Sequence, residues 1–130
     1  MPHRFALPML ALSALAIAGS PALAADSPRA CFFANQISSW KEAGDQTVNL
    51  RVGVSDFYQL RLLAPCPDLK WAEAIGLETH GGADTICSGL DVDVIIPGRV
   101  THSAPQRCMA TSLHKLTKDE VAALPKGQKP

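Results

Sequence analysis

Residues 47–63 have the sequence TVNLRVGVSDFYQLRLL, in which apolar and polar side chains alternate on both sides of Gly53. This period of two predicts two half-buried β-strands, because successive side chains of a strand point to opposite faces. The side chains expected to face the core are Val48, Leu50, Val52, Tyr58, Leu60 and Leu62. Residues 53–56 would make the reversal, so the sequence predicts an antiparallel hairpin.

One helical turn and four further strands are expected after the hairpin. Proline on both sides of Cys66 ends the second strand, because proline cannot donate to a β-ladder. Residues 68–74 are expected to form one helical turn, with Leu69, Trp71 and Ala72 partly buried. More strands are expected at 75–79, 84–87, 92–96 and 108–116.

A helix signal lies near the C-terminus. Thr117 and Glu120 have the spacing of a capping box, and Pro125 would end the helix that follows. The whole pattern predicts a mainly β fold: a small antiparallel sheet or partly closed barrel of five to seven strands with a short C-terminal helix.

The first 24 residues have the organisation of a cleavable secretion signal. His3 and Arg4 precede an apolar stretch of about 15 residues, which is shorter than the roughly 20 that a spanning helix needs. Residues 22–24 are Ala-Leu-Ala, a typical signal-peptidase site. We expect cleavage after Ala24, a bacterial periplasmic or secreted location, and a mature chain, residues 25–130, that lacks a membrane span.

The mature chain has the size of one domain. The full chain contains 12 Lys and Arg residues and 12 Asp and Glu residues, scattered singly. Because no basic stripe is present, the composition argues against nucleic acid as a partner.

All four cysteines, Cys31, Cys66, Cys87 and Cys108, lie after the signal segment. None is in a Cys-x-x-Cys pattern, which argues against a thioredoxin-like dithiol or a zinc knuckle. An even number of cysteines in an exported chain predicts two structural disulfides. Three connectivities are possible; we favour Cys66–Cys87 across neighbouring strands and Cys31–Cys108 between the two ends of the domain.

A metal site is the first alternative to a purely structural role for the polar residues. Asp91 and Asp93 would share one strand face, and His80 and His102 would have to be gathered by the fold to complete a zinc or copper site. The competing interpretation is a solvated strand face and loop histidines. No metal and no cofactor are therefore expected.

No catalytic residue can be assigned from the sequence. Ser88 precedes a glycine but lacks the G-x-S-x-G pattern of a nucleophile elbow, so a small hydrolase ranks below metal binding. The aromatic residues Trp40, Phe57, Tyr58 and Trp71 would either line a ligand groove or fill the core, and a domain with few aromatic residues favours the core.

Several motifs, taken in order, are shared with a group of exported proteins. They are Cys31-Phe32, Ile37 with Trp40, Thr47-Val48 with Arg51-Val52, Phe57-Tyr58 with Leu60 and Leu63, Pro65-Cys66-Pro67, Ile86-Cys87, Cys108, and Leu116-Thr117 with Glu120. In these the chain resembles a family of small exported bacterial proteins known only as a domain of unknown function. The resemblance implies an envelope or surface location and carries no known activity.

These observations favour a non-catalytic exported module, periplasmic or secreted, that binds a protein or another component of the cell envelope. The loops at 53–56, 80–84 and 97–106 would provide the contact surface, because a rigid β scaffold presents its connections to solvent. The oligomeric state is not indicated by any pattern in the chain.

Overall fold

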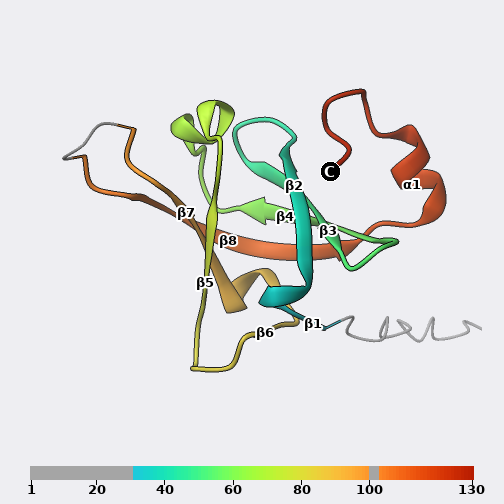
Figure 1. Cartoon of the computed structure of the whole chain (residues 1–130), viewed down its shortest axis with the longest axis horizontal. Helices are drawn as coiled ribbons and strands as arrows, with labels where there is room; N and C mark the ends of the chain where they lie inside the picture. The colour runs from blue at the N-terminus through green and yellow to red at the C-terminus, as the bar shows by residue number, and fades with distance from the viewer. Residues whose placement is uncertain (1–30, 100–102) are drawn as a thin grey trace, which may run out of the picture.

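The computed structural model describes residues 31–99 and 103–130 (Figure 1). The expected signal segment, residues 1–24, and His102 lie outside the described residues. The elements in chain order are β1 (Phe32–Phe33), η1 (Ala34–Gln36), β2 (Ile37–Glu42), β3 (Thr47–Val52), β4 (Asp56–Leu62), η2 (Pro67–Trp71), β5 (Gly76–Thr79), β6 (Thr85–Ile86), η3 (Gly89–Asp91), β7 (Val92–Ile96), β8 (Gln106–Lys115) and α1 (Lys118–Ala123), where η marks a 3₁₀ turn.

The hairpin predicted at residues 47–63 is present as β3 and β4. The strands pair antiparallel, with Leu50 opposite Tyr58 and Val52 opposite Asp56. The chain reverses at Gly53, whose φ of +61° lies in the left-handed region that favours glycine. Arg51 supports the turn by donating from Nε and Nη2 to the carbonyl oxygen of Val54. All six side chains expected to face the core are buried.

Six strands form one antiparallel sheet in the order β2-β3-β4-β8-β7-β5, curved into a half-barrel. The long strand β8 joins its two halves, because residues 106–109 pair with β7 and residues 110–115 pair with β4. Figure 1 shows β8 as the long curved strand that spans the molecule, with α1 following it. This confirms the predicted fold class. A separate two-stranded sheet, β1 with β6, pairs Phe32 with Ile86.

A single apolar cluster fills the concave side of the sheet. It contains the inward-facing residues of β3, β4 and β7, together with Phe32, Leu69 and Ile86. The rings of Phe32 and Tyr58 lie 4.6 Å apart, which places β1 against β4. Only Asn49 and Asp93 are buried polar residues in the described part of the chain.

Two disulfides are present, but the favoured pairing of the cysteines was wrong. Cys31 bonds Cys87 and Cys66 bonds Cys108, in place of Cys66–Cys87 and Cys31–Cys108. The reason is strand order: β6 pairs with β1, so Cys87 lies beside Cys31. Likewise β8 pairs with β4, so Cys108 lies beside the segment that leaves β4. Two disulfides indicate an oxidising, extracytoplasmic environment.

The C-terminal segment folds as predicted. The Thr117 hydroxyl accepts the N–H of Glu120 at 3.2 Å, and the N–H of Thr117 donates to the Glu120 carboxylate at 2.7 Å. Helix α1 ends before Pro125. None of the helices in the described residues is long and apolar enough to span a membrane.

Candidate functional site

Four charged side chains form an ion-pair cluster, defined here as Glu78 on β5, His80 directly after β5, Asp93 on β7 and Arg107 on β8. His80 Nε2 lies 3.1 Å from Asp93 Oδ2, and Arg107 Nη1 donates to the same oxygen at 3.0 Å. Arg107 Nη2 lies 2.6 Å from Glu78 Oε2. The cluster therefore joins three neighbouring strands, and two acids balance two bases.

The electrostatics of the cluster favour the charged forms of its members. Hydrogen bonds to Asp93 and to the carbonyl oxygen of Leu90 raise the pKa of His80 above its usual value. Burial raises the pKa of Asp93, but the hydrogen bonds from Arg107 and His80 outweigh it, and the net pKa is lowered. Hydrogen bonds to Glu78 and Asp93 raise the pKa of Arg107. His80, Asp93 and Arg107 thus stabilise one another's ionised forms.

Of the positions considered for a metal site, His80, Asp91 and Asp93 have other partners in this structure, and His102 lies outside the described residues. Both ring nitrogens of His80 are occupied, Nε2 by Asp93 and Nδ1 by the carbonyl oxygen of Leu90 at 2.9 Å. The Asp91 carboxylate accepts the N–H groups of Cys87 and Ser88, which lower its pKa. In residues 31–99 and 103–130, no group of three or more His, Cys, Asp or Glu residues is placed to hold a metal.

The expectation of a solvated face around Asp93 was wrong. Asp93 is only 5% exposed, because His80 and Arg107 cover the outer face of β7. Sequence reasoning missed Arg107 and Glu78. A period-two pattern on β8 marks Arg107 as outward-facing, but only the pairing of β7 with β8 brings it to Asp93.

The candidate nucleophile Ser88, and His114, a histidine not considered above, lie apart from the cluster. Ser88 precedes η3 and its N–H donates to Asp91, while His80 bonds Asp93 and Leu90 rather than Ser88. His114 pairs with Glu120 beside α1.

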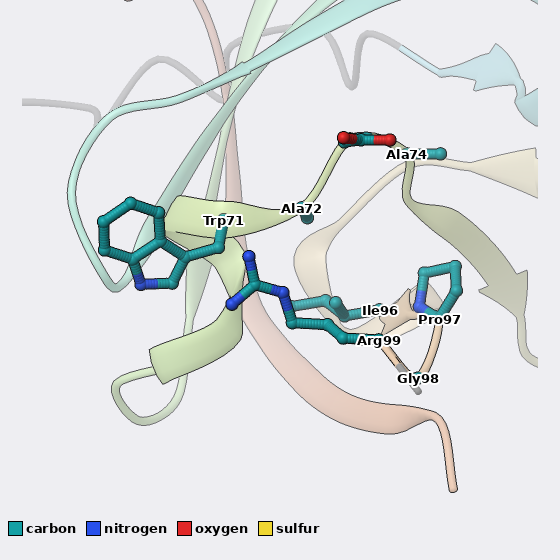
Figure 2. Close-up of a pocket in the computed structure, with 8 residues that line it drawn as sticks. Trp71, Ala72, Ala74, Ile96, Pro97, Gly98 and Arg99 are labelled. Atoms are coloured by element: carbon teal, nitrogen blue, oxygen red, sulfur yellow. The ribbon is translucent and has the colours of Figure 1, made fainter. Parts of the chain in front are cut away.

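A groove with a volume of about 360 Å³ lies beside Trp71, and we call it the Trp71 groove (Figure 2). It is lined by residues 71–74, at the end of η2 and after it, and by residues 96–99, at the end of β7 and after it. Residues 97–99 belong to a loop that was expected to form a contact surface. Glu73 and Arg99 supply charge, and Ile96 and Pro97 supply apolar surface.

Trp71 is 57% exposed, so the expectation that it is partly buried in the core was wrong. The tight turn of η2 explains the difference. Pro67 begins the turn and Leu69 is fully buried in the core. Because a 3₁₀-helix has about three residues per turn, Trp71 two positions later points to another side. The same turn therefore anchors the segment through Leu69 and presents an indole to solvent.

Two cations lie beside the Trp71 ring. Lys70 Nζ is 5.1 Å and Arg99 Cζ is 5.8 Å from the ring centroid. In Figure 2 the Arg99 side chain extends along the groove with its guanidinium group toward Trp71. Among the described residues, neither cation has a carboxylate partner, in contrast to Arg107 and Lys115, which do.

A second groove, the seam groove, lies between the two edge strands of the half-barrel. It has a volume of about 280 Å³ and is lined by residues 37–40 of β2, by Ala34 and Leu50, and by Ile75 and Leu77 at β5. Trp40 is one of the partly buried residues that pack on the core here. Tyr58 is buried in the core, whereas Trp71 and Trp40 line the two grooves described here.

The chain belongs to a family of unknown function (DUF6491), whose model matches residues 3–129. This confirms the resemblance inferred from the cysteine pattern and the order of segments. No curated protein matches the chain, and no solved structure matches it either.

Proposed function

We propose that this chain is a non-catalytic module, exported to the bacterial periplasm or beyond by cleavage after Ala24, that binds a component of the cell envelope through the Trp71 groove. The observation that carries the proposal is the exposed indole of Trp71 beside two cations that have no carboxylate partner within residues 31–99 and 103–130. A large exposed aromatic residue in a concave site is a typical anchor of binding surfaces.

The arrangement of the polar groups supports binding rather than catalysis. A general base needs a free lone pair within reach of substrate, and both ring nitrogens of His80 already have partners. Asp93 holds Arg107 and His80 together at a buried position. The ion-pair cluster is thus internally satisfied and stabilises the sheet that carries the Trp71 groove.

The disulfide framework supports a rigid scaffold for that groove. Cys66, one residue before η2, is bonded to Cys108 in β8. The turn that presents Trp71 is therefore covalently fixed to the central strand. A preorganised site loses less conformational entropy when it binds, which suits a binding module.

The test is co-sedimentation of oxidised residues 25–130 with the isolated envelope of the bacterium that encodes the protein. We expect saturable binding of the wild type and about a tenfold or greater loss for Trp71→Ala, the scale of loss typical of an aromatic anchor. Phe33→Ala is the matched control, because Phe33 is also aromatic and is 53% exposed on β1, outside the groove.

Two results would overturn the proposal. One is the absence of saturable sedimentation of the wild-type chain. The other is equal sedimentation of wild type and Trp71→Ala when thermal unfolding shows that both are folded.

A further inference from the structure

We infer that the ligand of the Trp71 groove is an acidic saccharide, that is, a sugar ring that bears a carboxylate. The inference rests on the proposed binding role of this groove and names the chemistry of the ligand. It is carried by three kinds of group at the groove: the exposed indole of Trp71, the cations Arg99, which lines the groove, and Lys70, which lies over the same indole, and the acidic residue Glu73.

The indole of Trp71 provides exposed apolar surface, and Lys70 and Arg99 lie over part of its ring. More than half of its surface is exposed, and the apolar surface of Ile96 and Pro97 lines the same groove. A pyranose ring has a face of C–H groups that packs flat on an aromatic ring, while its hydroxyl groups point to the rim. Burial of apolar surface on both partners favours this contact.

The charges beside the indole select an anion. Arg99 and Lys70 both lie within 6 Å of the ring centroid, and in the described residues neither is neutralised by a carboxylate. A guanidinium group binds a carboxylate through two parallel hydrogen bonds. A sugar stacked on Trp71 therefore places a ring carboxylate within reach of Arg99.

Glu73 favours an acidic saccharide over an aromatic acid as the ligand. Glu73 is one of the lining residues, and a carboxylate there needs hydrogen-bond donors when a ligand displaces water. Sugar hydroxyl groups supply such donors. An aromatic acid without hydroxyl groups would donate no hydrogen bond to Glu73 and would place a second negative charge beside it. At about 360 Å³ the groove is at the small end of ligand sites, which suits a short saccharide.

The experiment compares two probes of equal length and linkage: cellotriose, and the same trisaccharide oxidised at C6 to its uronic acids. Binding is followed by NMR through the indole N–H signals of Trp71 and Trp40, the second serving as an internal reference. We expect the acidic probe to shift the Trp71 signal with a Kd about tenfold lower than that of cellotriose, since only the acidic probe can form a charged hydrogen bond with Arg99.

Two variants test whether the preference for the acidic probe depends on Arg99. Arg99→Gln should remove most of the preference for the acidic probe, and Lys41→Gln, an exposed cation on β2, should leave it unchanged. Equal affinity of wild type for both probes overturns the inference, as does a preference that survives Arg99→Gln. If neither probe binds while the envelope still sediments the chain through Trp71, the inference fails and the proposed function stands. If envelope binding is also absent, both fail.

Discussion

The side-chain amide of Asn49 donates a hydrogen bond of 2.8 Å to the backbone carbonyl oxygen of Gln128, which lies 79 positions further along the chain. Asn49 is on the outer face of β3, opposite the core, yet it is completely buried. Its Oδ1 also accepts a hydrogen bond from Gln59 on β4 at 3.1 Å. The C-terminal tail therefore covers part of the outer face and satisfies the polar group that it buries.

We predict that Asn49→Ala lowers the free energy of unfolding by about 1–3 kcal/mol, because Gln59 and the Gln128 carbonyl each lose a partner at a buried position. Urea unfolding followed by circular dichroism measures the change. A chain that ends at Pro125 is the control: without the tail, Asn49 faces water and the same substitution should cost much less. Equal costs in the two chains would contradict this account of the tail.

The two disulfides should differ in their resistance to reduction. Cys31 is exposed, whereas Cys66 is fully buried, and thiol exchange requires access to a sulfur. Limited dithiothreitol under native conditions is expected to reduce Cys31–Cys87 first, as shown by alkylation and peptide mapping. Simultaneous labelling of all four cysteines would contradict it.

Each disulfide should also contribute to stability. The bonds span 56 and 42 positions, and the loop-closure model assigns roughly 4 kcal/mol to each. The paired substitutions Cys31→Ser with Cys87→Ser, and Cys66→Ala with Cys108→Ala, should each lower the urea midpoint by a similar amount. A disulfide whose removal leaves the midpoint unchanged would show that the unfolded chain is not restricted as the model assumes.

The ion-pair cluster predicts a stability that falls as the pH rises above the usual pKa of histidine, about 6.5. His80 faces Asp93 on β7, Arg107 on β8 and Asp91 on η3, and its pKa is raised in the folded state. A raised pKa stabilises the fold fully below the usual value of about 6.5 and loses that effect as the pH rises through the folded value. Thermal unfolding at a series of pH values should show this loss.

Substitution of His80 tests whether the titration of this residue causes the loss of stability at higher pH. In His80→Gln the loss of stability on raising the pH through this range should be smaller than in wild type. Wild-type and variant curves that stay parallel as the pH is raised from about 6 would rule out His80 as the responsible group.

Gly89 permits the contact between η3 and β8. A Cβ at this position would overlap the backbone of Thr111 and Ser112, so Gly89→Ala should destabilise the domain by about 3 kcal/mol, as overpacking does. Gly76→Ala is the matched control, because a Cβ there would lie 3.4 Å from Cβ of Ile95, which is ordinary contact. Comparable melting temperatures for the two variants would contradict the packing argument.

Local patterns in the sequence were sufficient for the local structure. The hairpin at residues 47–63 and the capping box at Thr117 and Glu120 depend on neighbours within a few positions, and both are present. The strands β5 and β7 were predicted by the same alternation.

Features that depend on strand order could not be predicted from local sequence patterns. Whether Cys66 meets Cys87 or Cys108 depends on β8 lying between β4 and β7, and no short pattern encodes that order. The burial of Asp93 by Arg107 has the same origin. Trp71 was misplaced for a different reason: the composition favours aromatic residues in the core, but Leu69 in the same turn already fills that position.

The half-barrel has a consequence for how the protein behaves at high concentration. Among the described residues, β2 and β5 each pair with a neighbour on one side only, and such edges are templates for strands from other molecules. The formal net charge of the chain is zero at pH 7, so electrostatic repulsion between copies is weak. Concentrated samples should therefore associate edge to edge near neutral pH, and moderately acidic or basic buffers should keep the molecules apart.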